Sequence, residues 1–352
     1  MLMLKKTIAA LSLLSILAAC QNDENPSQPE PKPRQDINLT RAEQEFMDKG
    51  TDFAFRFFDQ VCSTEKEKPN VFVSPLSASL CLSMITNGAT DNTLAEMQDV
   101  LGFPANTFSL DDLNNYNQKL TSALLDLDNT TQLGIANSIW IEEGFKVYDS
   151  FVDVNKKMYD AQVQELDFTS PTAKDMINQW CATQTNNCIK EVIQEIPADV
   201  RMYLINALYF KGIWKSQFDK SATGQDNFTN VDGSQQKVAM MNQTATFNYT
   251  QTDDFSIAEL PYGNEAFSMV ILLPSGDKTL DESLPSLNYE NWKQWSKNMV
   301  GKELQIKLPR FKVEYDKELE EDMIAMGMKD AFDAYKAKFA NMSGAELYIG
   351  LL

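Results

Sequence analysis

The chain has 352 residues, of which 43% are hydrophobic and 23% are charged, proportions typical of a globular protein with a sizeable core. The formal net charge of −19 at pH 7 gives an acidic surface that repels phosphate backbones, so we expect no binding to nucleic acid. Because the chain contains no histidine, Ser-His-Asp and Cys-His nucleophiles are excluded and the commonest metal ligand is missing; we expect no enzyme activity, no metal and no cofactor.

The N-terminus carries an export signal. Lys5 and Lys6 precede an apolar stretch at 7–19, which is too short to cross a bilayer of about 30 Å but suits a signal peptide. The stretch ends Leu17-Ala18-Ala19-Cys20, which resembles a bacterial lipobox. The pattern predicts a signal peptide at 1–19, cleavage before Cys20 and a lipid on the Cys20 sulfur. An ordinary signal peptide with a chance cysteine is the alternative.

Residues 20–37 are predicted to form a disordered, extended tether. They are polar and rich in proline, a composition that cannot bury enough apolar surface to fold. The acidic cluster directly after Cys20 resembles the surface-export signal of some bacterial lipoproteins. We therefore expect an exported protein anchored to the outer membrane only through the lipid on Cys20, and displayed on the cell surface or released. The sequence leaves open which leaflet holds the anchor.

Residues 38–352 are expected to form one compact unit, because no second linker or internal repeat follows the tether. A capping box at Thr40 begins a helix whose buried face carries Phe46, Phe53, Phe57 and Val61. A short buried strand is predicted at 71–73. Ser74-Pro75 begins a second helix, with Gly88 at its end.

The rest of the chain alternates between helical and strand-like patterns. Amphipathic spacing predicts helices at 145–159, at 173–193 and from Leu319 to Gly327. Apolar or alternating runs predict strands at 133–142, 202–210, 247–260, 266–273, 304–308 and 311–315. Helices dominate early and strands later, which indicates an α+β fold with large antiparallel sheets.

Four cysteines follow Cys20, and their spacing does not indicate a zinc site. Cys181 and Cys188 are seven residues apart in a predicted helix, about 10 Å along its axis, too far to form a disulfide. Cys62 and Cys81 form a disulfide if their helices pack together, or remain buried thiols; the sequence leaves both states open.

Four stretches together resemble one known family. They begin at Asn70, Ile205, Glu259 and Leu308, and read NVFVSPLS…NGAT, INALYFKGIW, ELPYG…ILLP and LPRFK…MGM…AF. In series they resemble the signature of the serpins, the serine protease inhibitor superfamily. The resemblance covers nearly all of residues 40 to 345 in order.

The resemblance implies a fold of three β-sheets wrapped by eight or nine helices. It also implies a function, since inhibitory serpins are suicide substrates: a protease cleaves an exposed reactive loop, which then inserts as a new strand into the main sheet. The expected partners are serine proteases, with cysteine proteases as a second class, and the expected state is a monomer. The alternative function is a non-inhibitory serpin-fold binding or structural lipoprotein at the cell surface.

The resemblance also assigns site residues, none of them catalytic. Ser74, Ser77 and Asn206 match the family's shutter, a set of polar residues beneath the sheet that opens. Trp214 matches the breach, where insertion of the loop begins. The simpler interpretations are a helix cap for Ser74 and a core aromatic for Trp214.

The sequence departs from the family pattern at its end, where the apolar run Leu347–Leu352 stands at the position of the last strand before the hinge. The hinge, the reactive loop, its scissile bond and the C-terminal strands are not within residues 1–352, so the target protease is not predicted. Either the sequence is a fragment or the gene is truncated, which would leave an inactive remnant. For residues 21–352 we expect an exposed sheet edge and low solubility.

Overall fold

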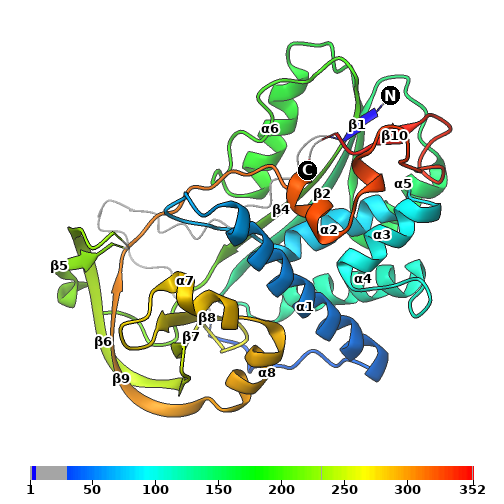
Figure 1. Ribbon diagram of the computed structural model, residues 1–352. Coiled ribbons are helices and arrows are strands. Elements are labelled where there is room, and N and C mark those ends of the chain that lie inside the picture. The colour runs from blue at the N-terminus through cyan, green and yellow to red at the C-terminus, as the bar shows by residue number, and fades with distance from the viewer. Residues whose placement is uncertain (1, 5–29, 231, 351) are drawn as a thin grey trace.

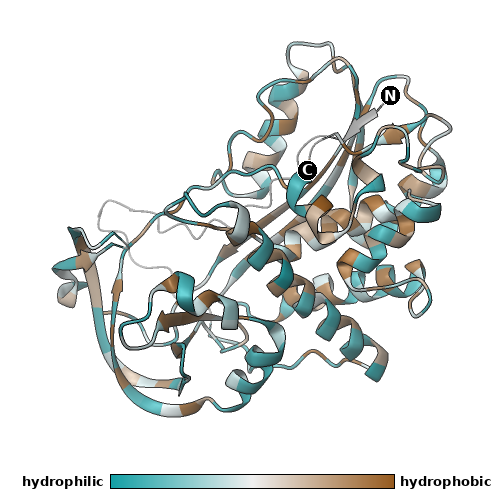
Figure 2. Ribbon diagram, viewed as in Figure 1, coloured by the Kyte–Doolittle hydropathy of each residue, from teal (hydrophilic) through white to brown (hydrophobic). Residues whose placement is uncertain are grey.

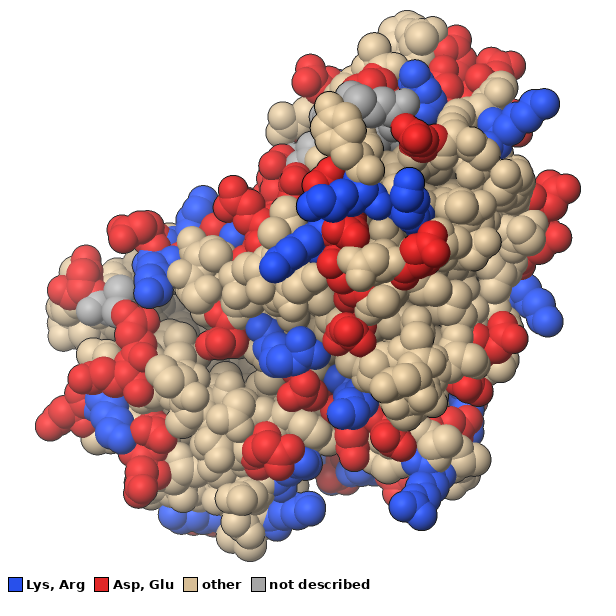
Figure 3. All heavy atoms as spheres, turned by 45° about the vertical axis from the view of Figure 1, so that its right-hand side comes forward, with Lys and Arg blue, Asp and Glu red and all other residues tan. Residues whose placement is uncertain are grey.

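The computed structural model describes residues 2–4, 30–230, 232–350 and 352 (Figure 1). Cys20 and most of the predicted signal peptide lie outside these residues. No helix in the described ranges is long and apolar enough to span a bilayer. On the face shown in Figure 3, lysine and arginine side chains are interspersed with aspartate and glutamate.

The first sheet runs through the middle of the molecule. Its strands lie in the order β10 (Leu347–Tyr348), β1 (Leu2–Leu4), β4 (Val200–Lys211), β2 (Gln132–Glu142) and β3 (Gln162–Leu166). β2 and β4 are antiparallel over their whole shared length, whereas β1 is parallel to both β4 and β10. β2 and β4 are therefore the long central pair of this sheet.

Alternation along these strands sends side chains to two separate cores. Ile139 and Leu204 face the helices α1 to α4, whereas Trp140, Tyr203 and Ile205 face α6 on the other side. Figure 2 shows the corresponding brown, hydrophobic strands between more hydrophilic helices. The first sheet is therefore buried on both faces.

The second sheet contains β5 (Gly224–Thr229), β6 (Gln235–Gln251), β7 (Phe255–Pro261), β8 (Ser268–Pro274) and β9 (Val300–Pro309). β6 is 17 residues long; its first part pairs with β5 and its later part with β9 and β7. The family resemblance implied three sheets. Here the described strands form two hydrogen-bonded sheets, because the continuous β6 joins both halves of the second one.

Nine α-helices occur in the described part of the chain, and the fold is α+β as predicted. They are α1 (Arg41–Thr64), α2 (Pro75–Thr86), α3 (Asp91–Leu101), α4 (Leu110–Asp126), α5 (Asp149–Tyr159), α6 (Ala173–Gln184), α7 (Leu280–Ser283), α8 (Tyr289–Lys297) and α9 (Glu320–Met326). Figure 1 places α1 to α5 beside the first sheet, and α7 and α8 beside the second.

Both predicted helix starts are confirmed. Thr40 caps α1 through a complete capping box, in which the Glu43 amide donates to Thr40 Oγ1 (3.3 Å) and the Thr40 amide donates to Glu43 Oε2 (2.6 Å). Ser74 caps α2, and Pro75 occupies its first turn. At the other end, α2 stops at Thr86 with Asn87 as its cap, slightly before the predicted Gly88.

Other predictions fail where tertiary contacts decide. Residues 71–73 and 311–315 form no strand; Val71, Val73 and Tyr315 pack against the core from irregular backbone. The helix predicted at 173–193 ends at Gln184. The strand predicted at 247–260 is the end of β6 and β7 without its last residue, separated by a turn.

The cysteines form no disulfide within the described residues. Cys62 on α1 is a half-buried thiol, and burial raises its pKa to about 11. Cys81 on α2 is fully buried and its Sγ donates to the Leu204 carbonyl at 3.7 Å. Cys188 follows the end of α6, so it is not in the helix that carries Cys181.

Residues 30–37, the described part of the predicted tether, contain no helix or strand and lie against α4. The Lys32 ammonium contacts the Asp126 carboxylate (2.7 Å), and the Lys32 amide donates to Asn129 Oδ1 (2.8 Å). Asn129 Nδ2 in turn donates to the Glu30 carbonyl (2.9 Å). The chain therefore leaves the folded body next to the C-terminal end of α4. Disorder of residues 20–29 stays a prediction.

Candidate functional site

A buried polar network begins at the N-terminus of α2 and continues onto β4. Ser74 Oγ accepts a hydrogen bond from the Ser77 amide (3.3 Å), which fixes the first turn of α2. The Ser77 hydroxyl then donates to Asn206 Oδ1 in the middle of β4. All three side chains are buried. The structure thus brings together the three residues that the sequence singled out for the shutter.

The network crosses from β4 to β2 through a pair of asparagines. Asn206 and Asn137 stand directly opposite each other in the antiparallel ladder, and Asn206 Nδ2 donates to Asn137 Oδ1 (2.7 Å). Asn137 Nδ2 donates to the backbone carbonyl of Tyr159 at the end of α5 (2.7 Å). Each asparagine therefore uses both ends of its amide, and the pair joins α2, β4, β2 and α5.

A second group of polar contacts gathers around the Tyr159 side chain. Its hydroxyl donates to Asn114 Oδ1 (2.7 Å) and accepts from Asn117 Nδ2 (3.3 Å), both on α4. Asn114 Nδ2 donates to Asn87 Oδ1 just beyond α2 (2.8 Å). Burial raises the pKa of Tyr159 far above its usual value of 10. The hydroxyl therefore keeps its proton and remains a donor at any ordinary pH.

The chemistry of this network is exchange of hydrogen bonds. Its members are hydroxyls and amides, which donate and accept equally well and can change partners when neighbouring elements move. It contains no pair of a nucleophile and a base.

Trp214 lies beyond the end of β4, away from the network. It forms an isolated antiparallel bridge with Tyr262, and the two rings stack at 4.3 Å with an interplanar angle of 17°. Gly212 permits this arrangement, because a Cβ at that position would lie 2.7 Å from the Tyr262 ring. Phe218 packs edge-on against Trp214 at 6.0 Å.

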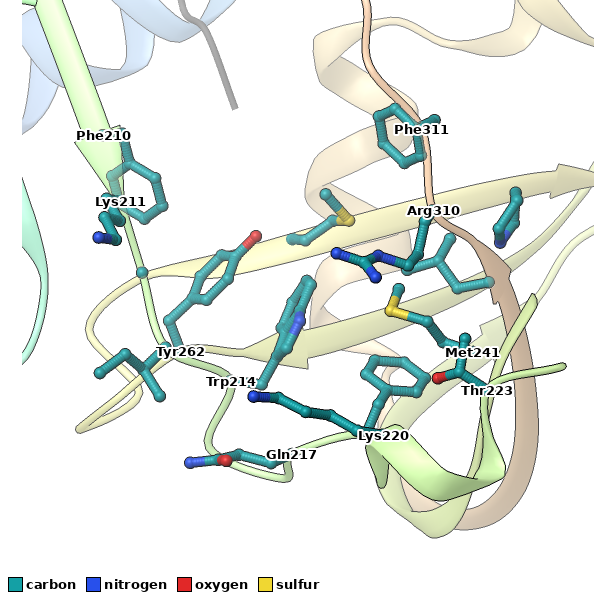
Figure 4. A pocket seen from close by; sticks show the side chains of 16 residues that line it. Phe210, Lys211, Trp214, Gln217, Lys220, Thr223, Met241, Tyr262, Arg310 and Phe311 are labelled. Atoms are coloured by element: carbon teal, nitrogen blue, oxygen red, sulfur yellow. The ribbon is translucent and has the colours of Figure 1, made fainter. Parts of the chain in front are cut away.

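A cavity of about 630 Å³ opens beside this aromatic stack (Figure 4). Its walls come from the end of β4, the segment that follows it, and the strands β6, β8 and β9. Most of the lining is aromatic or aliphatic, and it also includes three cationic residues: Lys211, Lys220 and Arg310.

Within the described residues, sequence reasoning named four site residues, Ser74, Ser77, Asn206 and Trp214, and missed other members of the network and of the cavity wall. Asn137, Tyr159 and Asn114 were not singled out, although Asn137 is a polar residue inside an apolar strand, which is a usable signal. Tyr262 was noted only as part of a turn motif, and Arg310 only as part of LPRFK. Nothing local shows that these residues belong to the network or to the cavity wall, since their positions depend on strand register and on packing between distant segments.

Comparison with known proteins identifies the family. The family model described as "Serpin (serine protease inhibitor)" matches residues 48–351. The chain is a serpin. An uncharacterised serpin-like protein of Methanosarcina acetivorans is 33% identical over 304 residues, covering 84% of this chain and 70% of the relative. Serpin B6 of Macaca fascicularis is 36% identical over 289 residues, with coverage of 79% and 76%.

Solved serpin structures agree with this fold. The thermophilic serpin tengpin in its native state superimposes with a TM-score of 0.79 at 29% identity, covering 92% of this chain and 81% of tengpin. Tengpin in its latent state gives 0.81 at 30% identity, covering 90% and 84%. This serpin therefore resembles two different states of one relative about equally well. Serpins are in general protease inhibitors and not catalytic enzymes.

Proposed function

We propose that this serpin inhibits serine endopeptidases as a suicide substrate, by inserting a cleaved reactive loop into the first sheet. The observation that supports the proposal is that β4 and β10 do not pair with each other but each pairs with a third strand, β1, between them. β1 lies there, with Leu2 opposite Leu347 and Met3 opposite Val200. Since β1 belongs to the segment predicted to be removed on export, the exported chain would have this position open to another strand.

Insertion is favourable for a simple physical reason. A strand of about a dozen residues gains ladder hydrogen bonds worth about 1 kcal/mol each, together with apolar burial on a sheet that is covered on both faces. The uncut protein is then held by a kinetic barrier. The network of Ser77, Asn206 and Asn137 lies beneath the strands that must adjust, and its groups can change partners as they do.

The insertion step is testable with a synthetic peptide. A 12-residue peptide of small and alternating apolar residues should bind between β4 and β10 and raise the Tm in a saturable, concentration-dependent way. The matched control has the same length and composition of apolar residues, with proline at every second position, so that it cannot donate to a ladder. Equal effects of the two peptides, or none from either, would contradict insertion.

Inhibition itself is tested with the complete gene product. Incubation with trypsin-, chymotrypsin- and elastase-like serine proteases, and with a papain-like cysteine protease, should give an equimolar complex that survives SDS. The reactive bond is not within residues 1–352, so the panel, and not this sequence, selects the target. Peptide insertion without any protease complex would instead identify a non-inhibitory serpin.

We also propose that the protein is exported and anchored to the outer membrane through a lipid on Cys20, with the serpin domain displayed at the cell surface. The support is the positive and apolar signal followed by Leu17-Ala18-Ala19-Cys20. Metabolic labelling with palmitate should mark the protein, and Cys20→Ser should abolish the label. Protease treatment of intact cells should then remove the domain. An unlabelled or fully protected protein would overturn the anchor or the surface location, respectively.

A further inference from the structure

We propose that the tether carries a release site, at which a trypsin-like serine endopeptidase cleaves the bond between Arg34 and Gln35 and frees the folded domain from its anchor. The release rests on the proposed lipid on Cys20, whereas the cleavage does not, so the two steps are tested separately. Three features of the chain support the site: the point where the folded body begins, the identity of the cationic residues before it, and the way the segment is held.

The bond lies outside the folded body. Between residues 30 and 45 no side chain is buried, and Phe46 is the first that is. Leu39, which packs partly against the core, and Thr40, which caps α1, both follow the bond. Cleavage after Arg34 therefore leaves α1, its cap and its core contacts in the released chain, so we expect the domain to stay folded.

The sequence directs a trypsin-like protease to one bond of the tether. Such enzymes bind a lysine or arginine side chain in an acidic pocket and cleave the bond that follows it. Residues 21–39 contain two cationic side chains, Lys32 and Arg34. Pro33 follows Lys32, and its ring substitutes the nitrogen of that bond and restricts the backbone before it. Gln35 follows Arg34 and has an ordinary amide, so the bond after Arg34 is the one that fits the protease.

The segment around this bond is accessible. Residues 30–36 are exposed and form neither helix nor strand, which is typical of sites where proteases cut a native protein. The Arg34 side chain is 59% exposed, and its ion pair with Asp36 (3.5 Å) is open to solvent and contributes little. The guanidinium can therefore leave this partner and enter a protease pocket at small cost.

Asn129 holds the tether on the anchored side of the bond. Its Oδ1 accepts from the Lys32 amide (2.8 Å) and its Nδ2 donates to the Glu30 carbonyl (2.9 Å), so the side chain pairs with the backbone as a neighbouring peptide group would. A protease that binds the tether as an added strand needs these same backbone groups. The Asn129 contact therefore competes with the protease, and its loss should speed cleavage.

The reaction is hydrolysis of one peptide bond. The bond between the Arg34 carbonyl carbon and the Gln35 nitrogen breaks, and one water molecule supplies the hydroxyl that completes the new carboxyl group and the hydrogen that completes the new amine. The protease provides the nucleophile and the base. Residues 20–34 stay with the lipid, and the released chain begins at Gln35.

The cleavage is tested on the full-length gene product extracted in detergent. Limited digestion with trypsin should give a chain whose first residue is Gln35, which N-terminal sequencing distinguishes from any cut in the reactive loop. Arg34→Gln removes the charge that the protease pocket binds and should slow this product at least about 10-fold. Lys66→Gln, at an exposed position in the loop after α1, is the matched control and should leave the rate unchanged. Products that begin elsewhere, or equal rates for Arg34→Gln and the wild type, would overturn the site.

A further variant tests the competing contact. Asn129→Ala frees the backbone of residues 30–32 and should speed cleavage after Arg34 about 2- to 10-fold, as the loss of one or two exposed hydrogen bonds allows. A rate equal to that of the wild type would show that the contact does not hold the tether against the protease.

The release is tested on intact cells. Added trypsin should move the domain into the medium with Gln35 at its N-terminus, and cells that carry Arg34→Gln should retain it. Cleavage of the extracted protein without release from cells would contradict the release and the surface display while leaving the site intact. Absence of the Gln35 product from the detergent extract would overturn the site whatever the state of the anchor.

Discussion

The buried polar network and the aromatic cavity both include residues of β4, yet their buried polar groups differ in hydrogen bonding. In the network, Asn206 and Asn137 each use both ends of the amide. Beside the cavity, the Tyr262 hydroxyl is equally buried and has no partner within the described residues. A polar group that is fully satisfied holds elements together, whereas one left unsatisfied marks either a weakness or a place for a ligand.

The largest expected effect comes from breaking the network at its centre. Asn206→Ala leaves the Ser77 hydroxyl and Asn137 Oδ1 buried without partners, and should lower the free energy of unfolding by about 2–4 kcal/mol. Thermal unfolding should report a fall in Tm of roughly 4–12 °C. Asn227→Ala, at an exposed position on β5, is the control and should change stability by less than about 0.5 kcal/mol. An equal fall in Tm for Asn206→Ala and Asn227→Ala would show that the buried network adds no more stability than an exposed side chain does.

A comparison of two buried tyrosines sharpens the contrast between the regions. Tyr159→Phe removes a hydroxyl with partners on α4 and should lower the free energy of unfolding by about 1–2 kcal/mol. Tyr262→Phe removes a hydroxyl without a partner and should leave stability unchanged within about 0.5 kcal/mol, or raise it. Chemical denaturation measures both. A cost for Tyr262→Phe as large as that for Tyr159→Phe would mean that the cavity hydroxyl is satisfied after all.

The edge of the network at Ser74 should matter less than its centre. Ser74→Ala removes the cap of α2 and should cost about 1 kcal/mol. Thr90 is a matched control, because it stands at the cap position of α3 without making a side-chain cap bond. Thr90→Ala should therefore cost less than about 0.5 kcal/mol. If Ser74→Ala lowers the free energy of unfolding as much as Asn206→Ala does, the helix cap and not the asparagine pair between the strands makes the larger contribution to stability.

The smallest effect concerns a surface contact outside both regions. The Lys119 ammonium (2.7 Å) and the Thr40 amide hold the pKa of Glu43 at about 2, below its usual value of 4.5. The stabilisation is therefore present above pH 4.5 and lost as the pH falls toward 2. Glu43→Gln should lower the Tm at pH 7 and match the wild type at pH 2. Glu45→Gln, at an exposed position on the same helix, should leave the Tm unchanged at both pH values. If Glu43→Gln still melts below the wild type at pH 2, the lowered pKa of Glu43 is not the cause of the difference.

The sequence identified those features that are local or that depend on order along the chain. The sequence predicted the helix caps at Thr40 and Ser74, strands that correspond to β2 and β4, and the series of family motifs. α3 and α4 were missed, although Ser109 and Asp112 form a capping box at the start of α4. The predicted strand at 71–73 and the second half of the predicted helix at 173–193 are wrong. Apolar residues are buried there in irregular backbone, and a periodic pattern of apolar residues does not distinguish such a segment from a strand or a helix.

In the candidate site too, the sequence identified some residues, and the others depend on contacts between distant segments. Ser74, Ser77 and Asn206 were found through family resemblance, and they do contact one another. Asn137 was not found, because its role depends on standing opposite Asn206 in a register set by pairing between strands more than 60 residues apart. The cavity was not predicted at all, since it needs the end of β4, the turn at Tyr262 and the segment after β9 to converge.

The contact between residues 30–32 and the end of α4 sets a distance from the cell. Glu30 lies ten steps along the chain from Cys20, and a fully extended chain of that length spans at most about 36 Å. If Cys20 carries a lipid, the point where Asn129 holds Glu30 can rise no farther than this above the head groups. The end of α4 that faces this contact would then be the part of the folded body held within this reach of the bilayer.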